Sequence, residues 1–88
     1  MPEEELLITN ERGLHARAAS KFVKLAAEFE ADISVSKDGQ TVSGLSIMGL
    51  MMLAAAPGDA VTLKTQGPQA AAAFNALKAL IVNKFQET

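Results

Sequence analysis

The chain has 88 residues, of which 49% are hydrophobic and 20% charged, with no cysteine and a formal net charge of −2 at pH 7. This composition predicts one compact domain at residues 1–88, without disulfides or a thiolate metal site, as expected of a cytoplasmic protein. The acidic balance and the lack of tryptophan and tyrosine disfavour nucleic-acid binding. The sequence also shows no basic apolar leader and no apolar run of bilayer length, which disfavours a signal peptide and membrane insertion.

The amino-terminal half changes its hydrophobic period twice. Residues 5–9 (ELLIT) alternate between apolar and polar side chains, which predicts a strand. The period then becomes about 3.6, which predicts an amphipathic helix beginning at Ala16. Residues 32–36 alternate again, and the Asp-Gly pair at 38–39 predicts a two-residue hairpin turn into a short strand over 40–42. This half therefore has the order strand, helix, hairpin.

The carboxyl-terminal half predicts a short helix, a strand and a last helix. Ser46 is a good N-cap for an apolar segment that ends at the Pro-Gly turn at 57–58. Residues 60–65 alternate as a strand, and the Gly-Pro pair at 67–68 precedes the last helix. The buried stripe of that helix is expected at Ala73, Phe74, Leu77, Leu80 and Ile81. The order β-α-β-β-α-β-α predicts an α+β fold in which helices cover one face of a single sheet.

His15 is the only histidine, and it lies between a glycine turn and the first turn of the predicted helix. The unpaired backbone N–H groups and the positive dipole end of a helix N-terminus favour an anion at this place. Arg17 adds a planar fork of donors that matches phosphate oxygens. This set suits a phosphoryl group held on a histidine nitrogen. The same pattern also occurs with an inert surface histidine, so spacing alone leaves both interpretations open.

The sequence gives little support to functions other than the holding of a phosphoryl group at His15. It indicates no second titratable group near His15, no set of metal ligands and no glycine-rich nucleotide loop. A self-contained acid–base enzyme, a bound metal and a cofactor are therefore disfavoured. A non-catalytic regulatory binding module on the same scaffold remains an alternative. By the same reasoning, Ser46 could be only a helix cap, and the methionines that follow it could belong to the core.

Two segments resemble one protein family. Residues 13–26 (GLHARAASKFVKLA) resemble the active-site signature of the HPr family, the histidine-containing phosphocarriers of the bacterial phosphotransferase system, and residues 44–53 (GLSIMGLMML) resemble its regulatory-serine segment. The resemblance covers nearly the whole chain. It implies an open-faced sandwich, with a four-stranded antiparallel sheet covered on one face by three helices. It also implies phosphorylation of His15 at Nδ1, phosphate stabilisation by Arg17, and regulatory phosphorylation of Ser46.

The resemblance further implies the partners. Phosphorylated enzyme I would donate the phosphoryl group, enzyme IIA-type proteins would accept it, and an HPr kinase/phosphorylase would act on Ser46. Such a chain is a transfer intermediate rather than a stand-alone enzyme, and we expect a monomer. The segments ITNERGLHARAA and GPQAAAAFNAL also resemble the nitrogen-related paralogue, so the sugar and nitrogen branches both stay open.

Two positions depart from the family pattern. Ala18 stands where proline is usual, which leaves the first helical turn regular but less pre-organised. Leu45 stands where lysine often precedes the regulatory serine, and it bears on recognition by the kinase. Partner docking is expected on a small, adaptable apolar surface. Its expected residues are Ile47, Met48 and Met51, together with Ser20 and Lys24.

Overall fold

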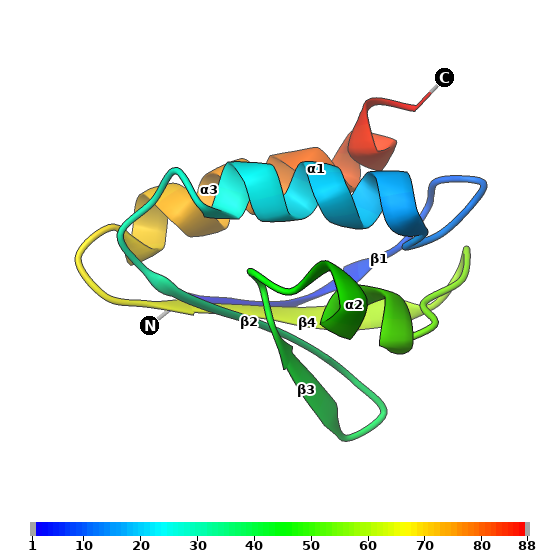
Figure 1. Cartoon of the computed structure of the whole chain (residues 1–88), viewed down its shortest axis with the longest axis horizontal. Coiled ribbons are helices and arrows are strands. Elements are labelled where there is room, and N and C mark those ends of the chain that lie inside the picture. Colours follow the sequence, from blue (N-terminus) through cyan, green and yellow to red (C-terminus); the bar gives the residue numbers. More distant parts are fainter. Residues whose placement is uncertain (1, 88) are drawn as a thin grey trace.

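The structure is a computed structural model that describes residues 2–87. Its elements are β1 (Glu3–Leu7), α1 (Ala16–Ala26), β2 (Asp32–Lys37), β3 (Gln40–Ser43), α2 (Ile47–Met52), β4 (Ala60–Gln66), α3 (Ala70–Val82) and the 3₁₀ turn η1 (Lys84–Gln86). The four strands form one antiparallel sheet in the order β1-β4-β2-β3. Helices α1 and α3 lie over one face of it, and α2 lies against α1 and β3 (Figure 1). The predicted α+β fold is confirmed.

The strand pairing places the apolar side chains of the sheet on one face. In the central strand β4, Val61, Leu63 and Thr65 are buried and alternate with half-buried residues. Leu6 of β1 pairs with Val61, and Val35 of β2 pairs with Leu63, so the buried positions of neighbouring strands lie side by side. A slip of one residue would turn this face toward water, which is why the register is well determined. The two edge strands of the sheet are β3 and β1. The first three residues of β1 are glutamates.

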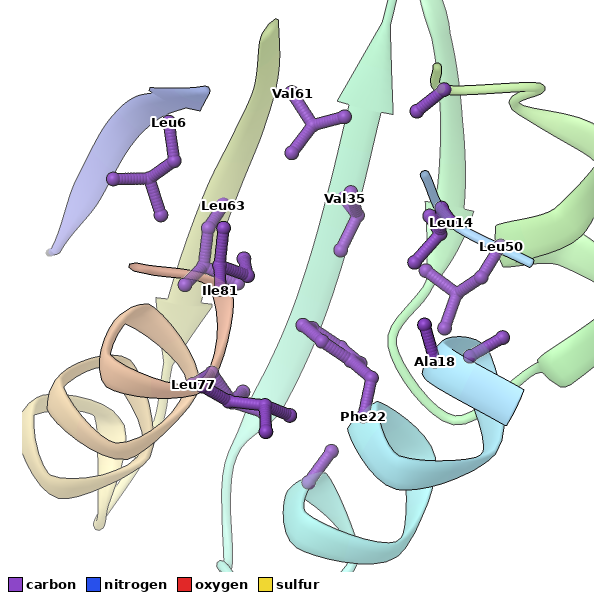
Figure 2. Close-up of a cluster of buried hydrophobic side chains, with 14 of the residues drawn as sticks. Leu6, Leu14, Ala18, Phe22, Val35, Leu50, Val61, Leu63, Leu77 and Ile81 are labelled. Atoms are coloured by element: carbon purple, nitrogen blue, oxygen red, sulfur yellow. The ribbon is translucent and has the colours of Figure 1, made fainter. Parts of the chain in front are cut away.

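The core lies between the sheet and the helices (Figure 2). Phe22 of α1 and Leu77 and Ile81 of α3 project into it, and all five residues predicted for the stripe of the last helix are buried. Leu50 of α2 is fully buried and packs into the same cluster near Leu14. A buried leucine side chain contributes about 1.5–3 kcal/mol to folding. Leu50 therefore anchors a helix of only six residues.

The hairpin forms as predicted. Lys37 and Gln40 are the last pair of the β2–β3 ladder, so residues 38 and 39 make the turn. Asp38 has φ 51° and Gly39 has φ 83°. Positive φ at both positions is what a type I′ turn needs, and such a turn matches the twist of the two strands.

Several element ends differ from the predicted ones. β1 ends at Leu7, and Ile8, which the alternation assigns to the strand, is buried just beyond it and donates its N–H to the carbonyl of Asp59 at 2.8 Å. α2 ends at Met52, before Ala54 takes a φ of 53°. Pro68 precedes α3, which begins at Ala70. Within residues 2–87, no helix has the length and apolarity that crossing a bilayer requires.

After α3 the chain reverses through η1, a turn that the sequence pattern does not indicate. Lys84, Phe85 and Gln86 have φ values of 57°, 55° and 62°, and none of them is glycine. Each such residue is disfavoured by about 1–2 kcal/mol, so the turn needs support from elsewhere. The Phe85 side chain is only 1% exposed, and Lys21 of α1 donates from Nζ to the Phe85 carbonyl at 2.7 Å. These contacts bring the carboxyl-terminal segment to the start of α1 (Figure 1).

Candidate functional site

His15 is the N-cap residue of α1. Its backbone is extended, with φ −85° and ψ −178°, and its carbonyl accepts the hydrogen bond of Ala19 N–H at 2.8 Å. The imidazole makes no capping hydrogen bond to the helix, and the His15 side chain is 22% exposed. The N–H groups of the first turn are thus left without a side-chain cap beside the ring, where they favour a negative charge.

A rigid turn carries His15. Gly13 has φ 65°, and a Cβ atom added there would collide with the carbonyl oxygen of Ala55, so only glycine fits. The N–H of Leu14 donates to the same oxygen at 2.8 Å. From within the turn, the Nδ2 of Asn10 donates to the Gly13 carbonyl at 2.7 Å. The position of the imidazole is therefore set by the contact between two loops.

Glu87 lies against His15, so the prediction that no second titratable group would lie near His15 is wrong. Glu87 Oε2 is hydrogen-bonded to His15 Nε2, and Glu87 Oε1 accepts from Asn10 Nδ2 at 3.1 Å. The hydrogen bond to His15, followed by the one from Asn10, lowers the pKa of Glu87 below its ordinary value of 4.5 against an opposing effect of desolvation. The carboxylate is therefore ionised near neutral pH.

A surface cavity of about 460 Å³ opens beside this pair. It is lined by Thr9, Asn10, Glu11, Arg12, Arg17, Lys21, Lys84, Gln86 and Glu87. Basic side chains outnumber carboxylates in this lining, so its potential favours an anion. Arg17 is exposed in the first turn of α1, and within residues 2–87 it forms no ion pair. Its guanidinium is therefore available to an anion near His15.

Ser46 is the N-cap residue of α2, as its sequence context predicts. Its Oγ accepts a hydrogen bond from Gly49 N–H at 2.9 Å, and the residue is half-buried. The capping interpretation is confirmed. Capping and modification use the same oxygen, so the structure is compatible with either role for the hydroxyl.

An apolar patch surrounds Ser46, and we name it the α2 patch. Its members are Leu45, Ile47, Met48, Met51 and Met52, which are all exposed. The interpretation of the methionines as core residues is wrong, because the side of α2 that faces the core is provided by Leu50 instead. Of the two residues predicted to dock from α1, Lys24 is exposed and Ser20 is half-buried, and α1 packs against α2.

The arrangement suits the holding of an anion more than the binding of a metal. Within residues 2–87, no three His, Cys, Asp or Glu side chains gather where they could hold a metal ion. The site combines an imidazole that accepts and donates, a free guanidinium and a helix N-terminus, which together favour a transferable phosphoryl group. The sequence predicted all three of these groups, whereas Glu87 and Lys84 reach the site only through the turn η1.

Comparison with known proteins gives a consistent result. Residues 2–83 match the family model for PTS-HPr, described as the phosphorylation site of the PTS HPr component. The chain is 47% identical over 87 residues to phosphocarrier protein HPr of Cupriavidus necator, and the match covers 99% of this chain and 98% of that protein. It is 42% identical over 85 residues to phosphocarrier protein NPr of Shewanella violacea, with 97% and 93% covered.

A solved structure shares the architecture. The crystal structure of HPr-C-His from Thermoanaerobacter tengcongensis superposes with a TM-score of 0.95 at 42% sequence identity. The superposition covers 100% of this chain and 99% of the other. The four-stranded sheet with its three helices is therefore the fold of these proteins.

Proposed function

The chain belongs to the HPr family of phosphotransferase-system phosphocarriers, and from that premise we propose that His15 accepts a phosphoryl group from phosphorylated enzyme I and passes it to enzyme IIA-type proteins. The observation that carries the proposal is the position of His15 at the N-cap of α1, beside a basic cavity that includes Arg17. In this proposal the chain is a monomeric cytoplasmic carrier. It needs no cofactor, because the reactive group arrives on a partner.

The proposed phosphoryl transfer to His15 involves only a few chemical groups. The Nδ1 lone pair of the neutral His15 ring forms a bond to phosphorus, while the N–P bond of the donor phosphohistidine breaks and its electron pair returns to the donor nitrogen. The guanidinium of Arg17 and the N–H groups of the first turn of α1 stabilise the charge on the phosphoryl oxygens. Positioning supplies the rest, since the donor and acceptor nitrogens must lie in line with phosphorus.

Docking is assigned to the α2 patch with Ser20 and Lys24. Exposed methionine side chains adapt to partner surfaces of different shape, which suits a carrier that meets a donor and several acceptors. Phosphorylation of Ser46 by an HPr kinase/phosphorylase would place about −1.5 to −2 charges within this patch. Docking would weaken, because the added charge would have to be desolvated against the partner. Leu45 stands where the family often has lysine before the regulatory serine, and this departure disfavours recognition by such a kinase.

The proposal is tested by incubating the protein with enzyme I and phosphoenolpyruvate and measuring its intact mass. We expect the addition of one phosphoryl group that is lost in acid, as a phosphoramidate bond should be. The His15→Ala variant should gain no mass. An acid-labile phosphate on that variant would contradict the assignment of His15.

The nitrogen-related pathway is a second candidate, because the relative from Shewanella violacea is named phosphocarrier protein NPr. The chemistry at His15 would be the same, and only the donor and acceptors would differ. Offering the phosphorylated protein to sugar-type and nitrogen-type IIA proteins separates the two branches. A non-catalytic binding module would accept no phosphoryl group from either donor.

A further inference from the structure

The contact between His15 and Glu87 has a direct chemical consequence for the ring. We infer that Glu87 is a positioning residue, which keeps the proton of the neutral His15 ring on Nε2 and thereby leaves the Nδ1 lone pair free to bond to phosphorus. The inference rests on the proposed function and adds a residue to it. Its basis is the hydrogen bond between Glu87 Oε2 and His15 Nε2.

The carboxylate is held in place by contacts on both sides. The amide of Asn10 is buried, with 1% exposure, and its Nδ2 donates both to Glu87 Oε1 and to the Gly13 carbonyl. One buried amide thus joins the carboxylate to the turn that carries His15. The segment before Glu87 is anchored by the buried Phe85 ring and by the hydrogen bond from Lys21. Glu87 is therefore in a position fixed relative to the imidazole.

The charge of Glu87 determines which ring nitrogen is protonated. An ionised carboxylate only accepts hydrogen bonds, so Nε2 must carry a proton to bond with it. With the proton on Nδ1 instead, the Nε2 lone pair would face the carboxylate oxygen, and that tautomer is disfavoured. A carboxylate that orients an imidazole in this way fixes its tautomer and leaves the far nitrogen without a proton. Here the far nitrogen is Nδ1.

The same contact acts during transfer. When Nδ1 bonds to phosphorus and Nε2 keeps its proton, the ring gains a positive charge. The electron pair of the broken donor bond stays on the donor nitrogen, so no further proton or oxidant is needed. Glu87 lies next to the developing charge and stabilises it. Lys21 lines the adjoining cavity, and its positive charge favours the ionised form of Glu87.

The tautomer is measured on the unphosphorylated protein by two-bond ¹H–¹⁵N correlation of the ring nitrogens, at a pH where the ring is neutral. The parent protein should show a proton on Nε2. Glu87→Ala should show a mixture of the two tautomers. Glu11→Ala removes a carboxylate from the same cavity without touching His15, and it should keep the parent pattern.

The kinetic arm uses the same Glu87→Ala protein with phosphorylated enzyme I. Its rate of phosphoryl acceptance should fall about tenfold, the size expected for losing a hydrogen bond to a charged group that is partly exposed. An unchanged tautomer or an unchanged rate in Glu87→Ala overturns the inference. A parent protein that accepts no phosphoryl group overturns the proposed function instead, and the spectra separate these outcomes because they need no donor.

Discussion

The hydroxyl oxygen of Ser46 accepts a hydrogen bond from the backbone N–H of Gly49 across the first turn of α2, at 2.9 Å. This bond satisfies one of the N–H groups that a helix start leaves unpaired. The same oxygen would carry the phosphate in regulation, and it borders the exposed α2 patch. The same oxygen atom therefore affects both the stability of the fold and partner docking, and substitutions of Ser46 can separate these two effects.

Ser46→Asp should keep the free energy of unfolding or raise it slightly, because aspartate is also a good N-cap and suits the helix dipole. The same change should weaken phosphoryl acceptance from enzyme I roughly ten- to hundredfold, because a charge desolvated at an apolar interface costs on the order of 1–3 kcal/mol. Urea denaturation and transfer kinetics measure the two effects. Ser46→Ala is the matched control, with a stability loss of about 1 kcal/mol and near-parent transfer. Unchanged kinetics in Ser46→Asp would reduce Ser46 to a cap.

Arg17→Ala should slow both acceptance and donation of the phosphoryl group, because it removes the free guanidinium beside His15. Its side chain is exposed, so the free energy of unfolding should stay within about 1 kcal/mol of the parent value. Transfer rates and urea denaturation check the two parts. Rates equal to those of the parent would mean that the start of α1 stabilises the phosphoryl group without Arg17.

The lowered pKa of Glu87 predicts how its contribution to stability depends on pH. The unfolded chain binds a proton at Glu87 near 4.5, the ordinary value, whereas the folded chain binds it only at lower pH. The contribution is therefore present above about 4.5 and is lost as the pH falls through the folded pKa. The difference in unfolding free energy between the parent and Glu87→Ala should therefore narrow as the pH falls below about 4.5. A difference independent of pH would refute this coupling.

Gly13→Ala should destabilise the fold, because the new Cβ meets the carbonyl of Ala55 in addition to the strain of a positive φ. Gly39→Ala is the matched control, since Gly39 also has a positive φ but has open space around it. The control should lose about 1–2 kcal/mol, and Gly13→Ala should lose at least about 1 kcal/mol more. Urea denaturation measures both losses. Equal losses would show that the loop of Ala55 yields to the methyl group.

The features that depend on residues close together in the sequence could be predicted from the sequence alone. Alternation identified the strands, a period near 3.6 identified α1 and the buried stripe of α3, and the Asp-Gly pair at 38–39 identified the hairpin. Ser46 was identified as a cap because capping involves residues three positions apart. The proximity of His15 to Arg17 and to a helix start is also local, so the centre of the candidate site was predictable.

The contact between His15 and Glu87 could not be predicted, because 72 positions separate them in the chain. It requires positive φ at three successive residues that are not glycine, a conformation that local preferences disfavour. Burial of Phe85 and the bond from Lys21 stabilise this turn, and both are tertiary contacts. Similarly, periodicity could not tell whether the methionines of α2 face the core, because one apolar residue at position 50 suffices to anchor a short helix.

The glutamates of β1 affect how two copies of the sheet could meet. β1 is an edge strand, and its outer backbone groups are free to pair with another strand. In an antiparallel pairing of two β1 strands centred on Glu4, Glu3 would face Glu5 of the other copy, and these like charges would repel at short range. This repulsion disappears when the carboxylates are protonated. The ionised glutamates of β1 therefore oppose the addition of a further strand at this edge of the sheet.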